Sequence, residues 1–276
     1  MIIQEFVKEV LLEDIGRGDL FGRVAPRKEA TAQIVAKSEG IVAGQPYLEA
    51  LAEFCHLRLY WFKRDGEAFG RGDVLLKIEG DAADLLAAER TLLNMLLHAS
   101  SIATQVQPYV RALEGTGVLL LDTRKTRPML RNFEKYAVRV GGAVNHRMGL
   151  DDALMLKDTH LSLIDDLDAF IEKARRKIPF TTKIEIECET VEMAAKAMDV
   201  GADIVMCDNM APEQIREAVL YRNENYPGVL LEASGNVTLE NIRQIAETGV
   251  DAISSGAIIH QSRWIDLSMK IVTEEK

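Results

Sequence analysis

The sequence predicts an α/β fold in two parts, a small α+β layer over about the first hundred residues and a parallel βα barrel from Gly117 onward. The barrel prediction depends first on a repeat, in which apolar runs rich in β-forming residues are each followed by a stretch with helical spacing. The six runs lie at 118–121, 153–156, 183–188, 203–207, 229–232 and 251–254. Consecutive βα units indicate a parallel sheet, either open and doubly wound or closed into a barrel.

The carboxyl ends of these runs give the second observation, because each carries charged, hydroxyl or glycine residues. In chain order the ends are DTRK (122–125), LKDTH (156–160), EIE (185–187), CDN (207–209), EASGN (232–236) and SSGA (254–257). An open doubly wound sheet concentrates its ligands at one switch point, whereas barrel strands all end around one site. The pattern therefore favours a barrel, and the Ser-Gly pairs after the last two runs match the place where barrels hold a phosphate.

The first hundred residues alternate irregularly between strands and helices, which is the third observation. A helix from Ile2 to Leu12 is followed by a strand-like run at 31–40 and a hairpin-like segment at 57–80. A long helical region then extends from about 82 to 113 with a leucine stripe. Arg90 lies at the edge of this stripe, where an arginine either snorkels to solvent or reaches into an interface.

The composition is that of a globular protein of 276 residues, with 47% hydrophobic and 28% charged residues and a net charge of -10. The acidic total argues against nucleic acid as a partner. No apolar run of about 18 residues is present and the amphipathic N-terminus carries acids, so we expect a cytoplasmic enzyme without a membrane segment. Cys55, Cys188 and Cys207 are unclustered, which predicts reduced, buried packing residues rather than a redox or zinc site.

Positive charge nevertheless collects between Arg124 and Arg147, where seven Lys or Arg residues occur with a single acid. A basic site in an acidic chain suggests a small ligand with several negative charges. We expect a helix between Pro128 and Gly141 with one apolar and one solvated basic face. The basic face comprises Arg131, Lys135 and Arg139. The apolar face comprises Met129, Phe133, Tyr136, Ala137 and Val140. The better ligand candidates are the residues at or after strand ends, namely Arg124, Lys125, His146, Arg147 and Lys157.

Several motifs together closely resemble the quinolinate phosphoribosyltransferase family, a type II phosphoribosyltransferase family. They are DTRKT (122–126), EKYAVRVGG (134–142), NHRMGLDD (145–152), LKDTH (156–160), the EIE and CDN pair, and LEASGN (231–236). The resemblance extends over essentially the whole chain. It implies an N-terminal open α/β sandwich (1–114), an incomplete TIM-like α/β barrel with the active site (115–261), and a C-terminal segment (about 262–276) that returns to the first domain.

The resemblance also implies a reaction. The family transfers phosphoribosyl from 5-phosphoribosyl 1-pyrophosphate to quinolinate with decarboxylation, which gives nicotinate mononucleotide, pyrophosphate and CO2 in de novo NAD biosynthesis. Arg124, Lys125, His146, Arg147 and Lys157, with Thr123, would surround the quinolinate carboxylates and the pyrophosphate. Lys125, Glu187 and Asp208 would be catalytic, and the two acids would face the ribose hydroxyls and Mg²⁺, bound directly or indirectly.

The remaining implied contacts are to phosphate and across subunits. Ser234, Gly235, Asn236, Ser255, Gly256 and Ala257 would hold the 5-phosphate. Arg90 would come from the partner subunit of a homodimer, with a hexamer as a further assembly. Four positions depart from the family pattern, namely Arg127, Met129, Thr159 and Ser255, and none of them removes a charge that the reaction needs.

Three other functions remain open. A class I aldolase barrel would use a strand-end lysine such as Lys125, Lys157 or Lys183 to form a Schiff base. A molybdenum-locus relative of the same fold would act on another acceptor. A sensor of phosphate ligands would need no such complete set of charged residues.

Overall fold

The computed structural model describes residues 2–272, and the chain divides into two compact units. The first unit comprises the described parts of Met1–Gln107, Asn132–Gly142 and Ser262–Lys276. The second unit comprises Pro108–Arg131 and Ala143–Gln261. The contacts thus group residues 132–142 with the first unit, whereas the sequence-based division at 114/115 assigns them to the barrel.

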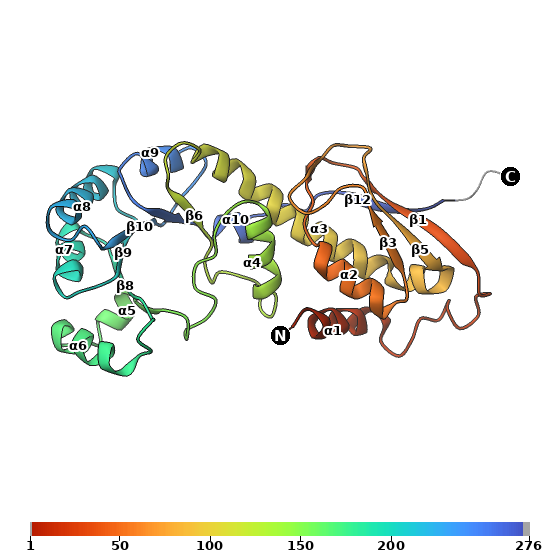
Figure 1. The fold of residues 1–276 in the computed structure, drawn as a ribbon, viewed down its shortest axis with the longest axis horizontal. Helices are drawn as coiled ribbons and strands as arrows, with labels where there is room; N and C mark the ends of the chain where they lie inside the picture. The colour runs from red at the N-terminus through yellow and green to blue at the C-terminus, as the bar shows by residue number, and fades with distance from the viewer. Residues whose placement is uncertain (1, 273–276) are drawn as a thin grey trace. The chain divides into compact units, whose positions relative to one another are not determined.

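A four-stranded antiparallel sheet forms the first unit, in the order β12-β1-β5-β3 (Figure 1). Its strands are β1 (Glu29–Ala36), β3 (Arg58–Trp61), β5 (Val74–Asp81) and β12 (Leu267–Val272), with a separate pair β2 (Gly40–Ile41) and β4 (Ala68–Phe69). The returning C-terminal strand β12 pairs with β1 from Leu267↔Ala36 to Val272↔Thr31. Residues 273–276 of the expected returning segment lie outside the described residues.

Helices complete the first unit, and one face of its sheet is buried. They are α1 (Ile3–Ile15), α2 (Gln45–Phe54), α3 (Ala82–Ala112) and α4 (Arg131–Val140), of which α3 continues into the second unit. Along β1 the burial alternates, as expected for a strand with one covered face. Ile34, Ile78 and Leu92 are fully buried, so the core of this unit lies between the sheet and α3.

Helix α4 differs from the sequence-based expectation. It begins at Arg131 and not at Pro128, and Met129 adopts a positive φ of 64° and is 76% exposed. Lys135 is fully buried, so the predicted solvated basic face is wrong at this position. The prediction assumed one apolar stripe, but Phe133, Glu134, Lys135, Ala137 and Val138 are all buried, which encloses most of the helix circumference.

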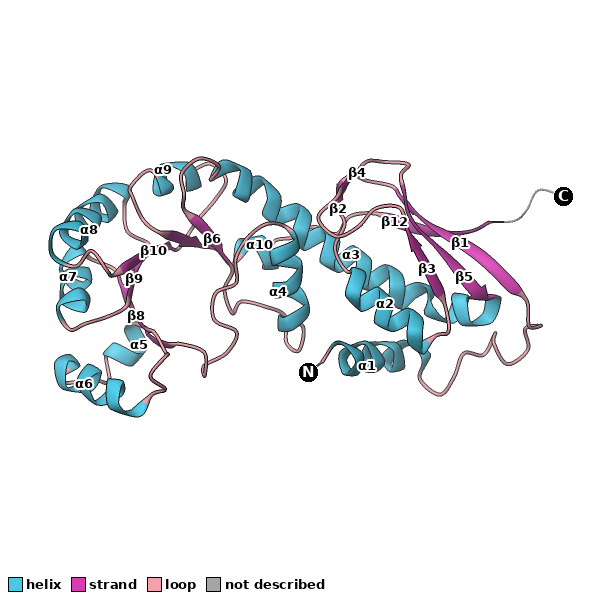
Figure 2. Ribbon diagram, in the orientation of Figure 1, coloured by secondary structure: helices cyan, strands magenta, loops and turns pink. Residues whose placement is uncertain are grey.

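A six-stranded parallel sheet forms the second unit, in the order β6-β11-β10-β9-β8-β7 (Figure 2). Its strands are β6 (Leu119–Leu121), β7 (Leu154–Leu156), β8 (Ile184–Cys188), β9 (Ile204–Asp208), β10 (Leu230–Ser234) and β11 (Ala252–Ser254). Each lies within or beside one of the six predicted runs, so the βα repeat is confirmed. The helices are α5 (Asp158–Leu161), α6 (Leu167–Lys177), α7 (Val191–Asp199), α8 (Pro212–Asn225), α9 (Ile242–Ala246) and α10 (Ala257–His260).

The parallel sheet stays open between its two edge strands, β6 and β7. A complete TIM barrel has eight strands. An isolated parallel bridge between Leu121 and Val144 continues the sheet edge beside β6. The α/β class, with a separate N-terminal sheet and an incomplete TIM-like barrel, is therefore confirmed.

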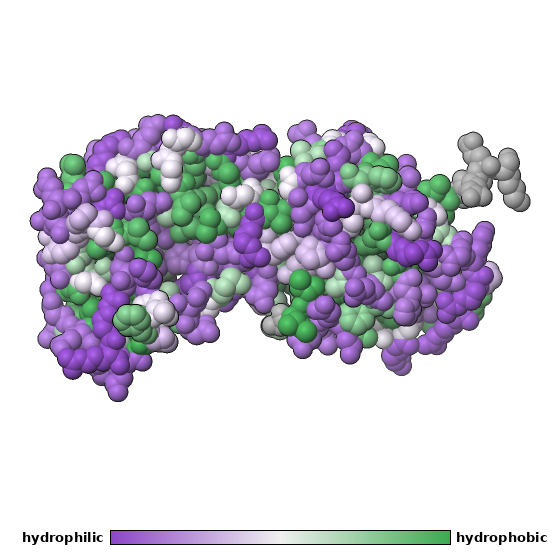
Figure 3. All heavy atoms as spheres, viewed as in Figure 1, coloured by the Kyte–Doolittle hydropathy of each residue, from purple (hydrophilic) through white to green (hydrophobic). Residues whose placement is uncertain are grey.

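The surface is mainly hydrophilic on the face drawn in Figure 3, with apolar atoms in small groups. Within residues 2–272, we find no helix that combines the length and the apolar character needed to cross a membrane. Cys55, Cys188 and Cys207 are all free and buried, which confirms the prediction of packing cysteines.

Candidate active site

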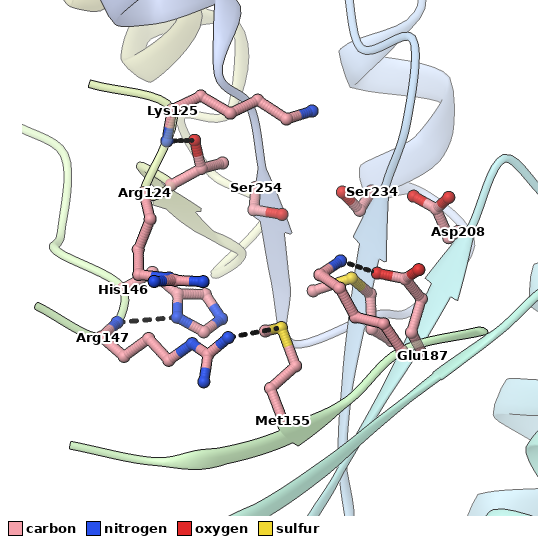
Figure 4. A pocket seen from close by; sticks show the side chains of 12 residues that line it. Arg124, Lys125, His146, Arg147, Met155, Glu187, Asp208, Ser234 and Ser254 are labelled. Atoms are coloured by element: carbon pink, nitrogen blue, oxygen red, sulfur yellow. Dashed lines mark hydrogen bonds and ion pairs between the residues drawn. The ribbon is translucent and has the colours of Figure 1, made fainter. Parts of the chain in front are cut away.

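A cavity of about 370 Å³ lies at the carboxyl ends of the parallel strands in the second unit (Figure 4). This size is typical of sites for small ligands. Its lining comprises Thr123, Arg124, Lys125, His146, Arg147, Met155, Lys157, Glu187, Met206, Asp208, Ser234 and Ser254. The parallel sheet therefore brings together in one cavity nine of the residues that the sequence marked as site candidates.

Asp122, fully buried at the end of β6, fixes the two loops that carry most of the cations. Its Oδ1 accepts the backbone N–H of His146 at 2.9 Å, and its Oδ2 accepts the side-chain amide of Asn145 at 2.6 Å. On its own loop, the backbone N–H of Lys125 donates to Thr123 Oγ1 at 3.0 Å. Arg124, Lys125, His146 and Arg147 consequently lie together on one side of the cavity, as Figure 4 shows.

The two arginines of this cationic side are held differently. Arg147 Nη1 donates to the carbonyl of Ala153 at 2.9 Å, and its Nη2 contacts Met155 Sδ at 3.5 Å. Burial, together with the nearby charge of Arg124, lowers the pKa of Arg147. The Arg124 side chain makes no hydrogen bond or ion pair with another residue of the described chain, so its guanidinium is available to a ligand.

Carboxylates occupy the opposite side of the cavity (Figure 4). Glu187 on β8 forms a close ion pair with Lys157, which follows β7. Asp208 ends β9, and its Oδ2 accepts the side-chain amide of Asn209 at 2.7 Å. Carboxylate oxygens are the ligands that Mg²⁺ prefers, so Glu187 and Asp208 fit a magnesium ion in donor type. Because Lys157 already neutralises Glu187, Asp208 is the carboxylate of the pair without a cationic partner among the described residues.

The loops after β9 and β10 contain positive-φ backbone that only certain residues tolerate. Asn209, Gly235 and Asn236 all have positive φ, of 54°, 86° and 44°. A Cβ on Gly235 would lie 2.2 Å from Asn209 Oδ1, so glycine is required there. Asn236 Nδ2 donates to the same Asn209 oxygen at 3.1 Å. Asn209 thus connects the end of β9 to the predicted phosphate loop.

The other predicted phosphate contacts continue the loops that reach the cavity. Ser234 lines it directly, whereas Gly235, Asn236, Ser255, Gly256 and Ala257 are not among the lining residues. The backbone N–H of Ser255 donates to the carbonyl of Leu121 at 3.0 Å, and α10 starts at Ala257. Gly256 lies close to the Lys125 side chain, since a Cβ there would be 3.0 Å from Lys125 Cδ.

Arg90 is the candidate that belongs to the first unit. It lies on α3 in the first unit, where it is exposed. The cavity is lined by residues of the second unit. The role of Arg90 across a subunit interface remains a prediction.

Two buried acids beneath the cavity were not among the predicted site residues. Glu185 on β8 and Glu232 on β10 are 0% and 2% exposed, and each has an oxygen near His146 Nε2, at 3.2 and 3.3 Å. The signal was present in the sequence, because Glu185 and Glu187 are two apart on one strand and must face the same side. Asn209 was likewise visible in the CDN motif but was not singled out.

These acids change the proton balance around His146. Burial alone would lower the pKa of His146, but the two nearby carboxylates, Glu185 and Glu232, outweigh it and raise the pKa to about 10. Burial and the charge of Glu232 raise the pKa of Glu185. Both shifts have the same meaning, namely that an additional proton is retained within this cluster at neutral pH.

Comparison with known protein families gives two matches that together span most of the chain. The model of the quinolinate phosphoribosyl transferase N-terminal domain matches residues 19–100, and that of the C-terminal domain matches residues 102–270. Among curated proteins, a probable nicotinate-nucleotide pyrophosphorylase [carboxylating] from Bacillus subtilis is 38% identical over 272 residues, covering 98% of this chain and 93% of that protein. The human nicotinate-nucleotide pyrophosphorylase [carboxylating] is 35% identical over 246 residues, covering 88% and 83%.

Solved structures agree with the sequence matches. A crystal structure of NadC from Streptococcus pyogenes superposes with a TM-score of 0.90 at 36% identity, covering 98% of this chain and 96% of that one. The nicotinate-nucleotide pyrophosphorylase from Francisella tularensis gives a TM-score of 0.88 at 33% identity, covering 98% and 96%.

Proposed function

Because the chain belongs to the quinolinate phosphoribosyltransferase family, we propose that it transfers phosphoribosyl from 5-phosphoribosyl 1-pyrophosphate to quinolinate. The products are nicotinate mononucleotide, pyrophosphate and CO2, in the synthesis of NAD. The proposal is supported mainly by the arrangement of charges in one cavity. Three cationic residues and His146 lie on one side, and the carboxylates of Glu187 and Asp208 lie on the opposite side. The cationic side suits an acceptor with two carboxylates, and the acidic side suits a ribosyl group with developing positive charge.

The chemistry of the acceptor explains why the cavity needs charges more than a general base. The pyridine nitrogen of quinolinate attacks through a lone pair that carries no proton. The barrier instead depends on the departing pyrophosphate, whose negative charge cationic residues of the cavity, Lys125 among them, are proposed to stabilise. After ribosylation, the ring nitrogen is cationic and stabilises the electron pair that loss of CO2 leaves on the adjacent ring carbon, so decarboxylation follows the transfer. A proton from water then adds to that carbon to complete nicotinate mononucleotide.

Glu187 and Asp208 are proposed to hold Mg²⁺ with the donor, directly or through water. When bound, the ion supplies charge that stabilises the pyrophosphate leaving group. Lys157 orients Glu187 through their ion pair and adds a further positive charge on that side of the cavity. Lys125, Glu187 and Asp208 are therefore the residues proposed to act on the reacting groups.

The remaining parts of the proposal concern the phosphate, the assembly and the compartment. Ser234, Gly235, Asn236, Ser255, Gly256 and Ala257 are proposed to bind the 5-phosphate of the donor through loop N–H groups and hydroxyls. We propose a cytoplasmic homodimer in which Arg90 of each chain reaches the partner's cavity, with hexamers as a further assembly. The exposed position of Arg90 on α3 supports this reading.

The test is to incubate the purified protein with quinolinate, the donor and Mg²⁺, and to follow nicotinate mononucleotide by chromatography. The proposal expects product that requires all three components. Donor binding without product from quinolinate would favour the molybdenum-locus relative. Covalent trapping of Lys125, Lys157 or Lys183 by borohydride with a carbonyl substrate would favour an aldolase.

A further inference from the structure

Two carboxylates that the proposed reaction does not use are buried directly beneath the cavity. Glu185 and Glu232 lie on the same strand faces as Glu187 and Ser234, two residues further from the carboxyl ends of β8 and β10. Glu187 and Ser234 line the cavity, whereas Glu185 and Glu232 line a second cavity of about 380 Å³. The two acids thus form a deeper layer inside the barrel.

His146 borders both layers, because it lines both cavities, as does Arg147. Its Nε2 lies between the two acids, 3.2 Å from Glu185 Oε2 and 3.3 Å from Glu232 Oε2. Its Nδ1 lies 2.7 Å from the backbone nitrogen of Arg147 and can accept that N–H when the ring is neutral. The orientation of the imidazole is therefore set from both edges of the ring.

Stability alone gives little reason for this arrangement. A buried carboxylate loses its hydration, and within the described residues His146 is the only ion-pair partner of Glu185, whose oxygens have no well-aligned hydrogen bond. Replacing a whole buried ion pair by well-packed apolar residues of similar volume is often neutral or stabilising. A pair of charges retained under these conditions indicates a role in the site above it.

We infer that Glu185 and Glu232 are positioning residues that hold the His146 ring, and with it the backbone of Arg147, in the orientation that binds the acceptor carboxylates. This inference rests on the proposed function. The acids touch no ligand themselves. They act through His146, whose Nε2 lies near both acids and whose side chain also lines the substrate cavity.

The test compares Glu185→Gln and Glu232→Gln with the wild type, because glutamine keeps the size and removes the charge. Glu213→Gln is the matched control, since the Glu213 side chain is 75% exposed on α8. For each variant, kcat and the KM values for quinolinate and for the donor are measured together with Tm. We expect a rise of about tenfold or more in the KM for quinolinate, as when a charge-assisted contact is lost, in variants that still fold.

The positioning role is separated from a structural one by repeating both substitutions in a His146→Ala background. If the acids act through His146, they no longer change the KM for quinolinate by more than about twofold in that background. Additive effects with His146→Ala, equal rises in both KM values, or a lower Tm with an unchanged KM would each overturn the inference. If a glutamine variant does not fold, stability is shown to depend on that acid, which equally contradicts it.

The outcomes also distinguish this inference from the proposed function. Wild-type protein that forms no nicotinate mononucleotide refutes the proposed reaction. Active wild type with unaffected Glu185→Gln and Glu232→Gln variants refutes only the positioning role.

Discussion

Arg124 offers the sharpest test of the cationic side of the cavity, through the substitution Arg124→Ala with Arg124→Lys as its companion. The guanidinium is half-buried, lines the cavity and has no hydrogen bond or ion pair with another described residue. Its removal should therefore leave the folded state almost unchanged, within about 0.5 kcal/mol or roughly 2 °C in Tm.

The effect on acceptor binding should be much larger. Loss of a charge-assisted contact to a carboxylate removes about 1.5–3 kcal/mol, which corresponds to a rise of roughly 10- to 150-fold in the KM for quinolinate. The charge of Arg124 also disfavours the charged form of Arg147, so relief of this repulsion should move the result toward the lower end. Arg124→Lys should recover part of the loss, because lysine keeps the charge but not the bidentate geometry.

Steady-state kinetics with quinolinate varied at saturating donor gives the KM, and thermal unfolding gives Tm. Arg176→Ala is the control, since this arginine is 74% exposed on α6 and pairs only with Glu172 among the described residues. An unchanged KM in Arg124→Ala would refute the acceptor contact. A Tm lower by many degrees would show instead that Arg124 supports the fold.

Four further outcomes follow from the geometry. Gly235→Ala should raise the KM for the donor and lower the free energy of unfolding by about 1–3 kcal/mol, because the new Cβ would lie 2.2 Å from Asn209 Oδ1. Gly228→Ala is the control and should change neither quantity, since a Cβ there would have no neighbouring atom within 4 Å. Thiol reagents should leave the native protein unmodified and react with three cysteines after denaturation. The reason is that burial raises the pKa of Cys55 to about 11 and of Cys188 and Cys207 to about 12. A thiol that reacts quickly in the native protein would contradict this prediction. Because the pKa of His146 is raised from 6.5 to about 10, the folded state retains a proton that the unfolded chain loses. The stabilisation of the folded state by this proton is complete below pH 6.5 and disappears toward pH 10. Tm of the wild type should therefore fall more over that range than Tm of His146→Ala, and parallel curves would contradict the prediction. Equal mixtures of Arg90→Ala and Lys125→Ala chains should regain about a quarter of wild-type activity if each site is shared between two subunits, and no recovery would place Arg90 outside the partner's site.

Much of the second unit follows from the sequence because parallel strands have a fixed polarity. Once the six apolar runs are identified as strands of one sheet, their carboxyl ends must converge. This is why Thr123, Lys157 and Asp208, far apart in the chain, line the same cavity. The functional assignment of each of these residues came from the family resemblance and remains to be tested.

The features that sequence reasoning missed depend on tertiary contacts. A period of 3.6 residues identifies one face of a helix, but it cannot show that α4 is enclosed on several sides, and so Lys135 was placed in solvent although it is buried. Strand alternation places Glu185 on the inner face of β8, but not opposite Glu232 with His146 between them. Which residues of other strands and loops face Glu185 depends on the register and packing of those elements, and local sequence patterns do not determine these.

The most direct measurement of the proposed reaction uses quinolinate labelled with ¹⁴C in its 2-carboxylate, together with the donor and Mg²⁺. Labelled CO2, pyrophosphate and nicotinate mononucleotide are quantified in the same samples over time. The account predicts equal amounts of all three and no labelled CO2 when the donor is omitted. Labelled CO2 without the donor, or pyrophosphate without nicotinate mononucleotide, would contradict a reaction in which phosphoribosyl transfer precedes decarboxylation.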